Sequence, residues 1–362
     1  MKYLRRYSFT LAFLALFLSW MWLRPEGPGQ VYQLDGQTMG TWYRVLVTEF
    51  PETLSDNELA QGIGEHLFRI DRELMSTYAP DSELSRFNRA PVGQWVDISA
   101  ELADVMMQAQ AISELTDGYF DVTVGPLVDR WGFGPVQEMP GSSRIPTDAE
   151  VQQLRGQVGF HHLDVSSQPP RLRKRHDVRV DLSAIAKGYG ADVVADYLDS
   201  VGLDSYFIEI GGELRLRGRK PDGSSWVPAI ERPSQGAPVV HDIIVVDGQS
   251  IAVAGSGDYR NYFEQDGVRF SHEIDPFTGR PVTHDLAAVY VITETAAEAD
   301  ALATAFMVMG VDRAYQLSQR LDLAAYFITK RSGDDGFDSR YTSQFANFLS
   351  DDDDLPGSTL EN

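Results

Sequence analysis

A carboxylate lies inside a segment that otherwise predicts a buried helix. Residues 298–310, EADALATAFMVMG, place Ala, Leu, Phe, Val and Met on every side of a helix, yet they include Asp300. Thr304 follows four residues later, so the two oxygen-bearing side chains share one helix face a turn apart. A buried carboxylate needs a paired charge, hydrogen bonds or a metal ion. One interpretation is a site of hard oxygen ligands for Mg²⁺ or Ca²⁺; the other is an acid favoured by the helix dipole.

A lysine stands near the start of a second predicted helix. Lys187 belongs to residues 180–198, VDLSAIAKGYGADVVADYL, in which we expect Ser183 to cap the helix. The helix dipole disfavours a cation at this end, unless an anion sits between the lysine and the free backbone N–H groups. The sequence is therefore compatible with an anion site here, and equally with a surface lysine on an ordinary helix.

A histidine follows a predicted hairpin turn. Residues 255–282 contain the turn pair Asp266-Gly267, and period-two spacing places His272 and Ile274 on one face of the returning strand. Histidine is the side chain best suited to accept a proton near neutral pH, which makes His272 a candidate general base. A structural histidine in a strand is the alternative.

An irregular segment rich in glycine and aromatic residues lies between these elements. Residues 117–134 read DGYFDVTVGPLVDRWGFG. Glycine and proline at this density predict a shaped loop rather than a helix or a plain strand. Such a loop either lines a flat ligand or is held in the core by its aromatic side chains.

The elements that must position these residues predict an α+β fold with largely antiparallel sheets and packed helices. Residues 57–74 and 99–116 are amphipathic at helical spacing, and residues 41–47 and 178–182 alternate as strands do. The Thr-x-x-Glu pattern at 295–298 predicts a capping box that starts the helix carrying the buried acid. Hairpin signals recur in the second half, at Gly211-Gly212, Asp222-Gly223, Asp247-Gly248 and Asp266-Gly267. Neither the dinucleotide-binding nor the P-loop glycine pattern is present in the sequence.

Composition excludes several classes of function. The chain of 362 residues has a formal net charge of −22 and a pI of about 4.6, so we expect no nucleic-acid partner. It contains no cysteine, which excludes disulfides, thiol catalysis and cysteine-ligated zinc.

The two ends of the sequence differ from the rest of the chain. A short basic segment precedes residues 8–23, which carry no charge, and residues 1–30 predict a signal or anchor segment with its linker. No small-residue cleavage pattern follows, which favours an uncleaved anchor over a cleaved export signal. The basic residues before the apolar run should stay in the cytoplasm and place residues 31–345, a single domain, outside. Residues 346–362 predict a flexible acidic tail.

Eight segments together resemble the ApbE family, the FAD:protein FMN transferases. They occur in order across residues 37–310: MGTWYRV (39–45), STYAPDSELSRFN (76–88), DGYFDVTVGPLVDRWGFG, DLSAIAKGYGAD, IEIGGELRLRG (208–218), GSGDYRNYF, HEIDPFTGRPV and EADALATAFMVMG. Two positions depart from the family pattern. Phe277 stands where the family usually has arginine, and Gly190 where a larger residue is common.

The resemblance implies an enzyme with FAD as substrate and Mg²⁺ as cofactor. Such an enzyme moves the FMN half of FAD onto a threonine hydroxyl of a partner protein and releases AMP. Family acceptors are membrane flavoprotein subunits of the sodium-translocating NADH:quinone reductase and of Rnf-type complexes, and they carry a motif resembling Asp-Gly-x-x-Thr. With the N-terminal anchor, the resemblance implies a place on the periplasmic face of the bacterial inner membrane.

The resemblance also implies roles for individual residues. His272 would be the general base, and Lys187 would face the phosphates as a catalytic residue alongside Asp300. The metal ligands would be Ala184 and Ala303, through their carbonyls, with Asp300 and Thr304. The remaining positions would line the FAD site: Met39, Tyr78, Tyr119, Phe120, Asp121, Asp181 and Ile274. Three alternatives stay open: an FAD pyrophosphatase that uses water as nucleophile, a non-catalytic flavin-binding or metal-delivery protein of the periplasm, and a membrane-anchored assembly factor.

Overall fold

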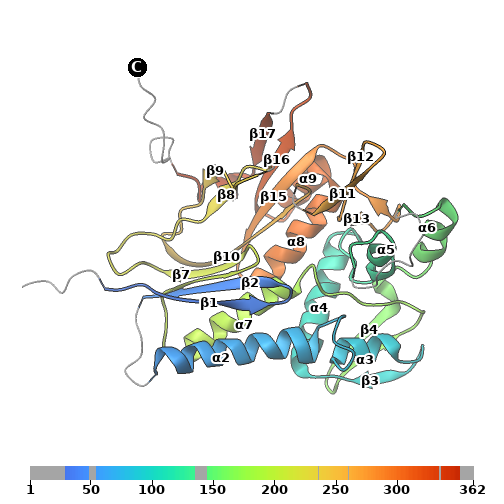
Figure 1. Cartoon of the computed structure of the whole chain (residues 1–362), viewed down its shortest axis with the longest axis horizontal. Helices are drawn as coiled ribbons and strands as arrows, with labels where there is room; N and C mark the ends of the chain where they lie inside the picture. Colours follow the sequence, from blue (N-terminus) through green and yellow to red (C-terminus); the bar gives the residue numbers. More distant parts are fainter. Residues whose placement is uncertain are drawn as a thin grey trace, which may run out of the picture.

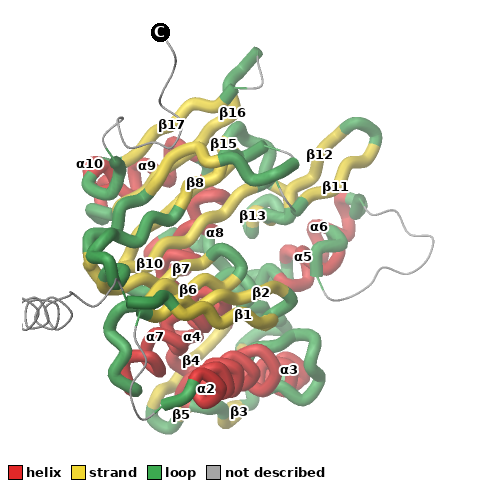
Figure 2. The backbone as a smooth tube through the Cα atoms, turned by 60° about the vertical axis from the view of Figure 1, so that its left-hand side comes forward, coloured by secondary structure: helices red, strands yellow, loops and turns green. Residues whose placement is uncertain are grey.

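The computed structural model describes residues 29–48, 54–134, 145–234, 236–259, 261–333 and 336–350. Its centre is an eight-stranded sheet with the order β1-β2-β6-β7-β10-β15-β16-β17. Every neighbouring pair in this sheet is antiparallel. Figure 2 shows these strands following one another from β1 to β17. The predicted α+β fold with antiparallel sheets is confirmed.

The strands are β1 Tyr32–Thr38, β2 Thr41–Val47, β3 Trp95–Asp97, β4 Leu163–Ser167, β5 Pro170–Lys174, β6 Tyr206–Ile210, β7 Glu213–Gly218, β8 Ala229–Glu231, β9 Val240–Ile243, β10 Gly248–Gly257, β11 Tyr262–Gln265, β12 Val268–Ser271, β13 Ile274–Asp275, β14 Arg280–Pro281, β15 Leu286–Thr293, β16 Ala324–Lys330 and β17 Phe337–Tyr341. The helices are α2 Asp56–Phe68, the π-helical η1 Arg69–Leu74, α3 Glu83–Arg89, α4 Ala100–Leu115, α5 Gly125–Arg130, α6 Asp148–Arg155, the 3₁₀ turn η2 Phe160–His162, α7 Ala186–Ser200, α8 Ala296–Met309, α9 Val311–Arg320 and α10 Ser343–Ala346.

The helices that matter for the site pack together against the central strands. Helix α8 contacts β10 and β15 of the sheet and crosses α7, and α7 in turn packs against α2. In Figure 1, α7 and α2 lie below the strands while α8 runs behind them. Nearly every residue of α8 is buried, as its apolar composition predicts.

Several local predictions are confirmed. The predicted helix 57–74 is α2 continued by η1, the predicted helix 99–116 is α4, and the predicted strand 41–47 is β2. The segment 117–134 is irregular up to Val124 but then forms the short helix α5, which the prediction of a loop missed.

The predicted strand at 178–182 is wrong, although its alternating burial is correct. Val178, Val180 and Leu182 are buried, but no neighbouring strand pairs with them in the described structure. The side-chain amide of Asn88 makes the hydrogen bonds to Val180 that a neighbouring strand would make. Its nitrogen donates to the carbonyl of Val180 at 2.8 Å, and its oxygen accepts from the Val180 N–H at 2.8 Å. A side chain has thus satisfied the backbone groups that a sheet would otherwise pair.

Two of the four predicted hairpin turns join paired strands. Gly211-Gly212 connects β6 to β7, and Asp266-Gly267 connects β11 to β12 with positive φ at both residues. Asp222-Gly223 lies in a turn between β7 and β8, which do not pair with each other. Gly248 is the first residue of β10 and pairs with Gly218 of β7, not with the preceding strand β9. Turn residues in the sequence therefore indicate where the chain can reverse, but not which strand pairs with which.

The chain ends differ in what the structure describes. The predicted anchor lies outside the described residues apart from its last two positions, and none of the described helices is long and apolar enough to cross a membrane. At the other end, the Phe348 carbonyl accepts from Val245 N–H, and Leu349 forms a bridge with Ile244. The packed fold therefore extends beyond residue 345, where the prediction placed the start of the tail.

Candidate active site

Helices α7 and α8 touch backbone to backbone. A Cβ added to Gly188 would lie 2.1 Å from the carbonyl oxygen of Ala296 and 2.7 Å from the N–H nitrogen of Ala297. Real Cβ atoms do not approach other atoms so closely, so only glycine fits at position 188. This contact brings the start of α7 against the first turns of α8, although the two segments are more than a hundred residues apart in sequence.

An aspartate of α7 holds the start of α8. The two carboxylate oxygens of Asp192 accept from the N–H groups of Ala296 at 2.8 Å and Ala297 at 2.9 Å. Burial raises the pKa of Asp192 to about 6. Thr295 is the N-cap, as the capping-box pattern predicts, and its hydroxyl accepts from Glu298 N–H at 3.4 Å. The return bond from the Glu298 side chain to the Thr295 N–H is absent among the described hydrogen bonds, and Asp192 instead satisfies the next two N–H groups, those of Ala296 and Ala297.

Replacing Asp192 with asparagine should destabilise the fold. The amide keeps one oxygen for one N–H of α8 but turns an NH₂ group toward the other, which leaves a buried donor unpaired. We expect a loss of about 1–3 kcal/mol in the free energy of unfolding, measured with urea at pH 8. Asp196→Asn, at an exposed position on the same helix, is the matched control and should change stability by less than about 0.5 kcal/mol. Equal stability of the two variants would contradict the capping role.

Asp300 lies at the junction of the two helices and is only 3% exposed. Its Oδ2 accepts from the N–H of Gly188 at 3.1 Å, and its Oδ1 lies 3.7 Å from Nζ of Lys187. The same Nζ donates to the carboxylate of Glu213, the first residue of β7. Two buried carboxylates therefore flank one lysine, and the predicted meeting of the segments around 187 and 300 is observed.

The charges in this cluster act on one another strongly. Burial raises the pKa of Asp300 and of Glu213, and the neighbouring ammonium of Lys187 opposes both rises. Burial alone would lower the pKa of Lys187, but the carboxylates of Asp300 and Glu213 raise it. The lysine therefore stays charged and lies beside carboxylates of the chain itself. Their negative charge offsets the unfavourable placement of a cation at the start of a helix.

The start of α7 leaves a main-chain oxygen free. The helix begins at Ala186 with Ile185 at the N-cap, so the expected cap at Ser183 is wrong. Ser183 instead donates its N–H to the side chain of Asp181 at 2.9 Å, in a turn that precedes the helix. The Gly188 N–H, which helical geometry would direct to the carbonyl of Ala184, donates to Asp300. Within the described residues, no donor reaches the Ala184 carbonyl.

The oxygen atoms of this junction suit a hard cation. Thr304, half-buried one turn beyond Asp300, finds no hydrogen-bond partner for its hydroxyl among the described residues. Its hydroxyl and the free carbonyl of Ala184 are oxygen atoms of the kind that Mg²⁺ or Ca²⁺ prefers. Ala303 lies inside α8, where a carbonyl oxygen accepts a helical hydrogen bond. Only the second lone pair of this oxygen could therefore bind a cation. Clusters of three or more His, Asp or Glu side chains suited to a metal are absent from the described residues.

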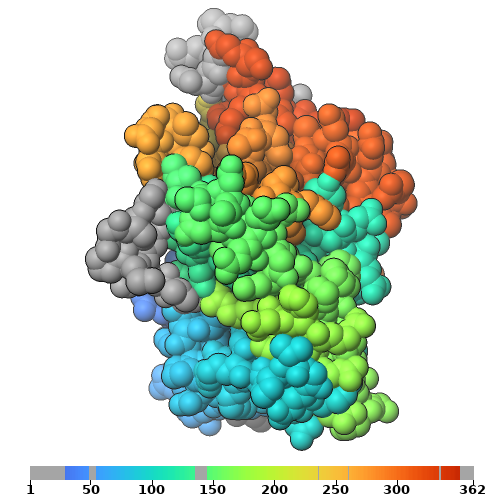
Figure 3. All heavy atoms as spheres, turned by 90° about the vertical axis from the view of Figure 1, so that its right-hand side faces the viewer, coloured from blue at the N-terminus to red at the C-terminus, as the bar shows by residue number. Residues whose placement is uncertain are grey.

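His272 lies in the bend between β12 and β13, at 32% side-chain exposure. Its Nδ1 lies 3.0 Å from the carbonyl oxygen of Asn261, and its Nε2 lies 3.4 Å from Oε1 of Glu273. This part of the chain packs against α5 and α6, where the indole N–H of Trp131 donates to the Gly279 carbonyl at 2.9 Å. Figure 3 shows the residues around β11 to β14, in orange, lying against the green residues of α6.

Two predicted FAD contacts, Met39 and Tyr78, differ in exposure. Met39 has a φ of 48°, in the left-handed region, at the turn between β1 and β2. A Cβ on Gly190 would lie 2.7 Å from Cε of Met39, so the glycine found at this unusual position makes room for the methionine. Tyr78 is 70% exposed, and its partial removal from water, with the nearby charge of Asp181, raises its pKa.

The remaining predicted contacts are built into the fold. Phe120 and Ile274 are buried in apolar clusters, so only their main chain can face a ligand. Asp121 is also buried: its carboxylate accepts from Thr123 at 2.8 and 2.6 Å and from the N–H of Phe160 at 2.9 Å. The side chain of Asp121 therefore holds the loop together.

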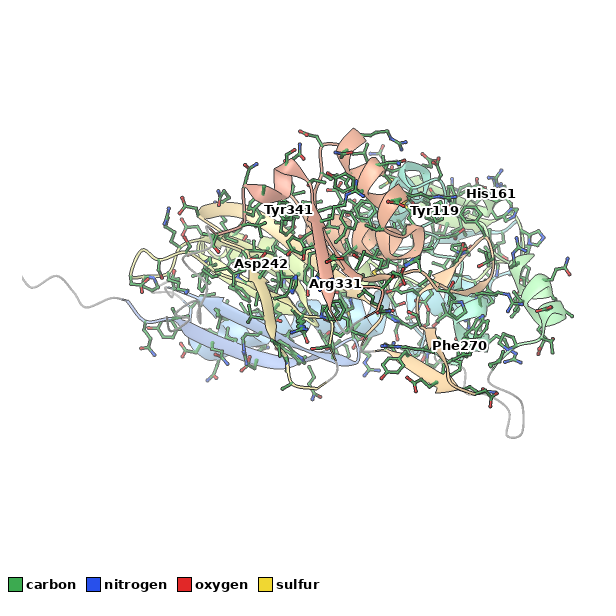
Figure 4. The ribbon with its side chains drawn as sticks, turned by 90° about the horizontal axis from the view of Figure 1, so that it is seen from above. Tyr119, His161, Asp242, Phe270, Arg331 and Tyr341 are labelled. Carbon is green, nitrogen blue, oxygen red and sulfur yellow. The ribbon has the colours of Figure 1, made fainter. Side chains whose placement is uncertain are left out.

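Tyr119 remains half-exposed at the edge of this loop. It meets the ring of Phe277 edge-on at 4.9 Å between centroids, so the residue that departs from the family pattern joins an aromatic contact. Figure 4 shows Tyr119 at the same end of the molecule as Phe270 of β12.

Sequence reasoning missed three acidic residues of the site: Asp192, Glu213 and Glu273. Each makes its contact across the fold or at a chain bend, so neither helical nor strand periodicity indicates it. The sequence offered one clue: Glu213 directly follows the turn pair Gly211-Gly212. In the structure this turn lies close to the lysine, because a Cβ on Gly211 would lie 3.3 Å from Cδ of Lys187.

The sequence model of the ApbE family matches residues 39–327. The chain belongs to the ApbE family. A relative from Vibrio cholerae serotype O1, an FAD:protein FMN transferase, is 43% identical over 325 residues, which cover 90% of this chain and 95% of the relative. The FAD:protein FMN transferase of Escherichia coli K12 is 39% identical over 324 residues, which cover 88% of this chain and 90% of the relative.

A solved structure confirms the fold of this ApbE family member. The flavin transferase ApbE from Vibrio cholerae superposes with a TM-score of 0.80 at 42% identity, over 89% of this chain and 100% of that one. The predictions of the family and of the transferase class are therefore confirmed.

Proposed function

We propose that this chain transfers the FMN half of FAD, in a Mg²⁺-dependent reaction, to a threonine hydroxyl of a partner flavoprotein and releases AMP. The acceptors would be membrane subunits of NADH:quinone reductase or Rnf type that carry an Asp-Gly-x-x-Thr-like motif. The reaction would take place at the periplasmic face of the bacterial inner membrane, with residues 1–30 as anchor. The observation that carries the proposal is the buried junction of Lys187, Gly188 and Asp300, in a chain similar to FAD:protein FMN transferases over most of its length.

The residues of the junction match what phosphoryl transfer needs. The threonine oxygen forms a bond to the phosphorus of the FMN half as the bond from that phosphorus to the AMP oxygen breaks. Such reactions depend on positioning and on stabilisation of charge. Asp300, Thr304 and the Ala184 carbonyl would hold Mg²⁺, which when bound neutralises charge on the pyrophosphate. Lys187 places a second positive charge beside them.

His272 is suited to receive the proton of the attacking hydroxyl. Its Nδ1 is occupied by the carbonyl of Asn261, so Nε2 is the nitrogen that can accept. Its half-exposed position lets an acceptor segment approach from outside the protein.

An assay of products tests this proposal against its alternatives. The purified full chain in detergent is mixed with FAD, Mg²⁺ and an acceptor domain, and the intact mass of the acceptor is recorded together with released AMP. Covalent FMN on the acceptor with an equal amount of AMP supports the transferase. AMP with free FMN and an unlabelled acceptor would establish a pyrophosphatase, and intact bound FAD a carrier. Chelation of divalent metal should stop labelling.

Replacing His272 with alanine should slow labelling without weakening the binding of FAD. A general base contributes about 10²–10⁴-fold to the rate, so we expect a loss in this range, with the Kd for FAD within about twofold of wild type. Labelling rates and a fluorescence titration of FAD measure the two effects. His241→Ala, on β9, is the control, because this histidine bonds to Ser339 away from the junction. A variant as fast as wild type would remove His272 from the mechanism.

A further inference from the structure

Glu273 is a buried carboxylate with one close basic neighbour. Its side chain is 7% exposed, and its Oε1 lies 3.4 Å from Nε2 of His272. Among the described residues, no hydrogen-bond donor reaches this carboxylate. Burial raises the pKa of Glu273, as expected for an acid removed from water. An acid in such a place needs a compensating partner or a function.

The other charges around Glu273 leave His272 as its partner. Lys187 of α7 favours the ionised acid, while Asp258, after β10, and Asp300 of α8 disfavour it. The ammonium of Lys187 is already bonded to Glu213. The histidine ring is therefore the group through which this carboxylate can act.

A bend in the chain brings the two neighbouring side chains together. The N–H of His272 donates to the carbonyl of Asn261 at 3.2 Å, on the β11 side. The carbonyl of Glu273 accepts from the N–H of Val282 at 3.0 Å, on the β14 side. In a regular strand, successive side chains point to opposite faces. Here the bend at residue 272 lets the ring and the carboxylate meet.

The hydrogen bonds of the ring determine which nitrogen is basic. A carbonyl oxygen only accepts hydrogen bonds, so Nδ1, 3.0 Å from the Asn261 oxygen, carries the hydrogen of the neutral ring. Nε2 then has the lone pair and faces the Glu273 carboxylate. Two acceptors cannot bond to each other, which agrees with their separation of 3.4 Å. A proton taken up at Nε2 would create an imidazolium beside a carboxylate.

We infer that Glu273 is a positioning residue for the transfer reaction, whose carboxylate stabilises the imidazolium of His272 once Nε2 has taken up the proton. This inference rests on the proposed function. The hydroxyl proton of the acceptor passes to Nε2, the threonine oxygen bonds to phosphorus, and AMP leaves with the electron pair of the broken P–O bond. The carboxylate of Glu273 stays ionised throughout and acts only through the ring.

The Glu273→Gln variant separates this role from a structural one. Glutamine keeps the shape but offers an N–H to Nε2, which occupies the lone pair. We expect kcat for labelling to fall by about tenfold or more, while KM for FAD stays within about twofold. In the His272→Ala background the same change should have no further effect, because the group through which it acts is gone. Glu264→Gln, at an exposed position on β11, is the control and should behave as wild type.

A second measurement does not depend on activity. Nitrogen-15 NMR of the full chain in detergent, labelled in its histidines, reports the state of the His272 ring, assigned with the His272→Ala variant. We expect the Nε2 signal to move in Glu273→Gln and not in Glu264→Gln. An unmoved signal, or a rate loss that is additive with His272→Ala, would overturn the inference. If the Nε2 signal moves in Glu273→Gln but the wild-type protein does not label the acceptor, the transfer reaction is rejected, while the contact between Glu273 and His272 is supported.

Discussion

Replacing Asp300 with alanine is expected to reduce FMN labelling by at least about 10³-fold, the largest effect of any single side chain in this protein. The change removes the one carboxylate among the oxygen atoms that suit Mg²⁺ at the junction. It also leaves the N–H of Gly188 without its acceptor and takes away one of the two carboxylates beside Lys187. Charge, geometry and the proposed metal binding would all be lost together.

The experiment must separate lost chemistry from lost folding. The change breaks a buried charge pair and leaves the N–H of Gly188 without an acceptor, so we expect Asp300→Ala to lose at least about 1–3 kcal/mol in the free energy of unfolding. Labelling is therefore measured at a temperature at which circular dichroism shows that the variant is folded. Asp300→Asn keeps the shape and one neutral oxygen, and it should recover part of the rate only at raised Mg²⁺. Asp312→Ala, at a side chain 85% exposed on α9, is the matched control. Wild-type rates in Asp300→Ala would reject the metal assignment.

Replacing Gly188 with alanine should have the largest effect on stability. The new methyl group would meet backbone atoms of Ala296 and Ala297, at 2.1 to 2.7 Å, and backbone atoms cannot swing aside as a side chain can. Helices α7 and α8 would have to separate, which stretches the Asp192 cap and the bond from residue 188 to Asp300. We expect a loss of about 3–5 kcal/mol in the free energy of unfolding, with labelling reduced to a similar degree as in Asp300→Ala.

A second helical glycine provides the control for this variant. A Cβ on Gly64, in α2, meets no atom within 4 Å. Alanine there should stabilise the protein by about 0.5–1 kcal/mol, because it restricts the unfolded chain and suits a helix. Urea unfolding followed by circular dichroism compares the two variants. If Gly188→Ala were as stable as Gly64→Ala, the helices could not be in backbone contact.

Much of the site was predictable because local patterns and ordered motifs both point to it. The apolar helix with Asp300, its Thr295 cap and the lysine at the start of α7 all follow from spacing along the chain. The eight family segments occur in order and predicted the fold class and the transferase class, and the comparisons confirm both. The roles of individual FAD contacts stay predictions, and the side chains of Phe120, Asp121 and Ile274 are buried within the fold.

The failures came where one part of the chain satisfies another. Residues 178–182 have the alternation of a strand, but the amide of Asn88, some ninety residues away in sequence, bonds to their backbone. Lys187 at the start of α7 lies beside two carboxylates of the chain itself, Asp300 and Glu213, which the spacing along the chain did not indicate. Periodicity reports which side of an element is buried but carries no information about which distant group faces it.

The sequence alone therefore determined the composition of this site: an acid, a threonine, a lysine and a histidine on elements of known type. The tertiary structure decided how they are used. In the folded chain Asp300 accepts from the N–H of Gly188, Lys187 contacts a second carboxylate in Glu213, and Glu273 lies beside His272. The physical reason is that hydrogen bonds and charges act over a few ångströms in space, and only the folded packing of α7, α8 and the β12–β13 bend decides which groups come that close.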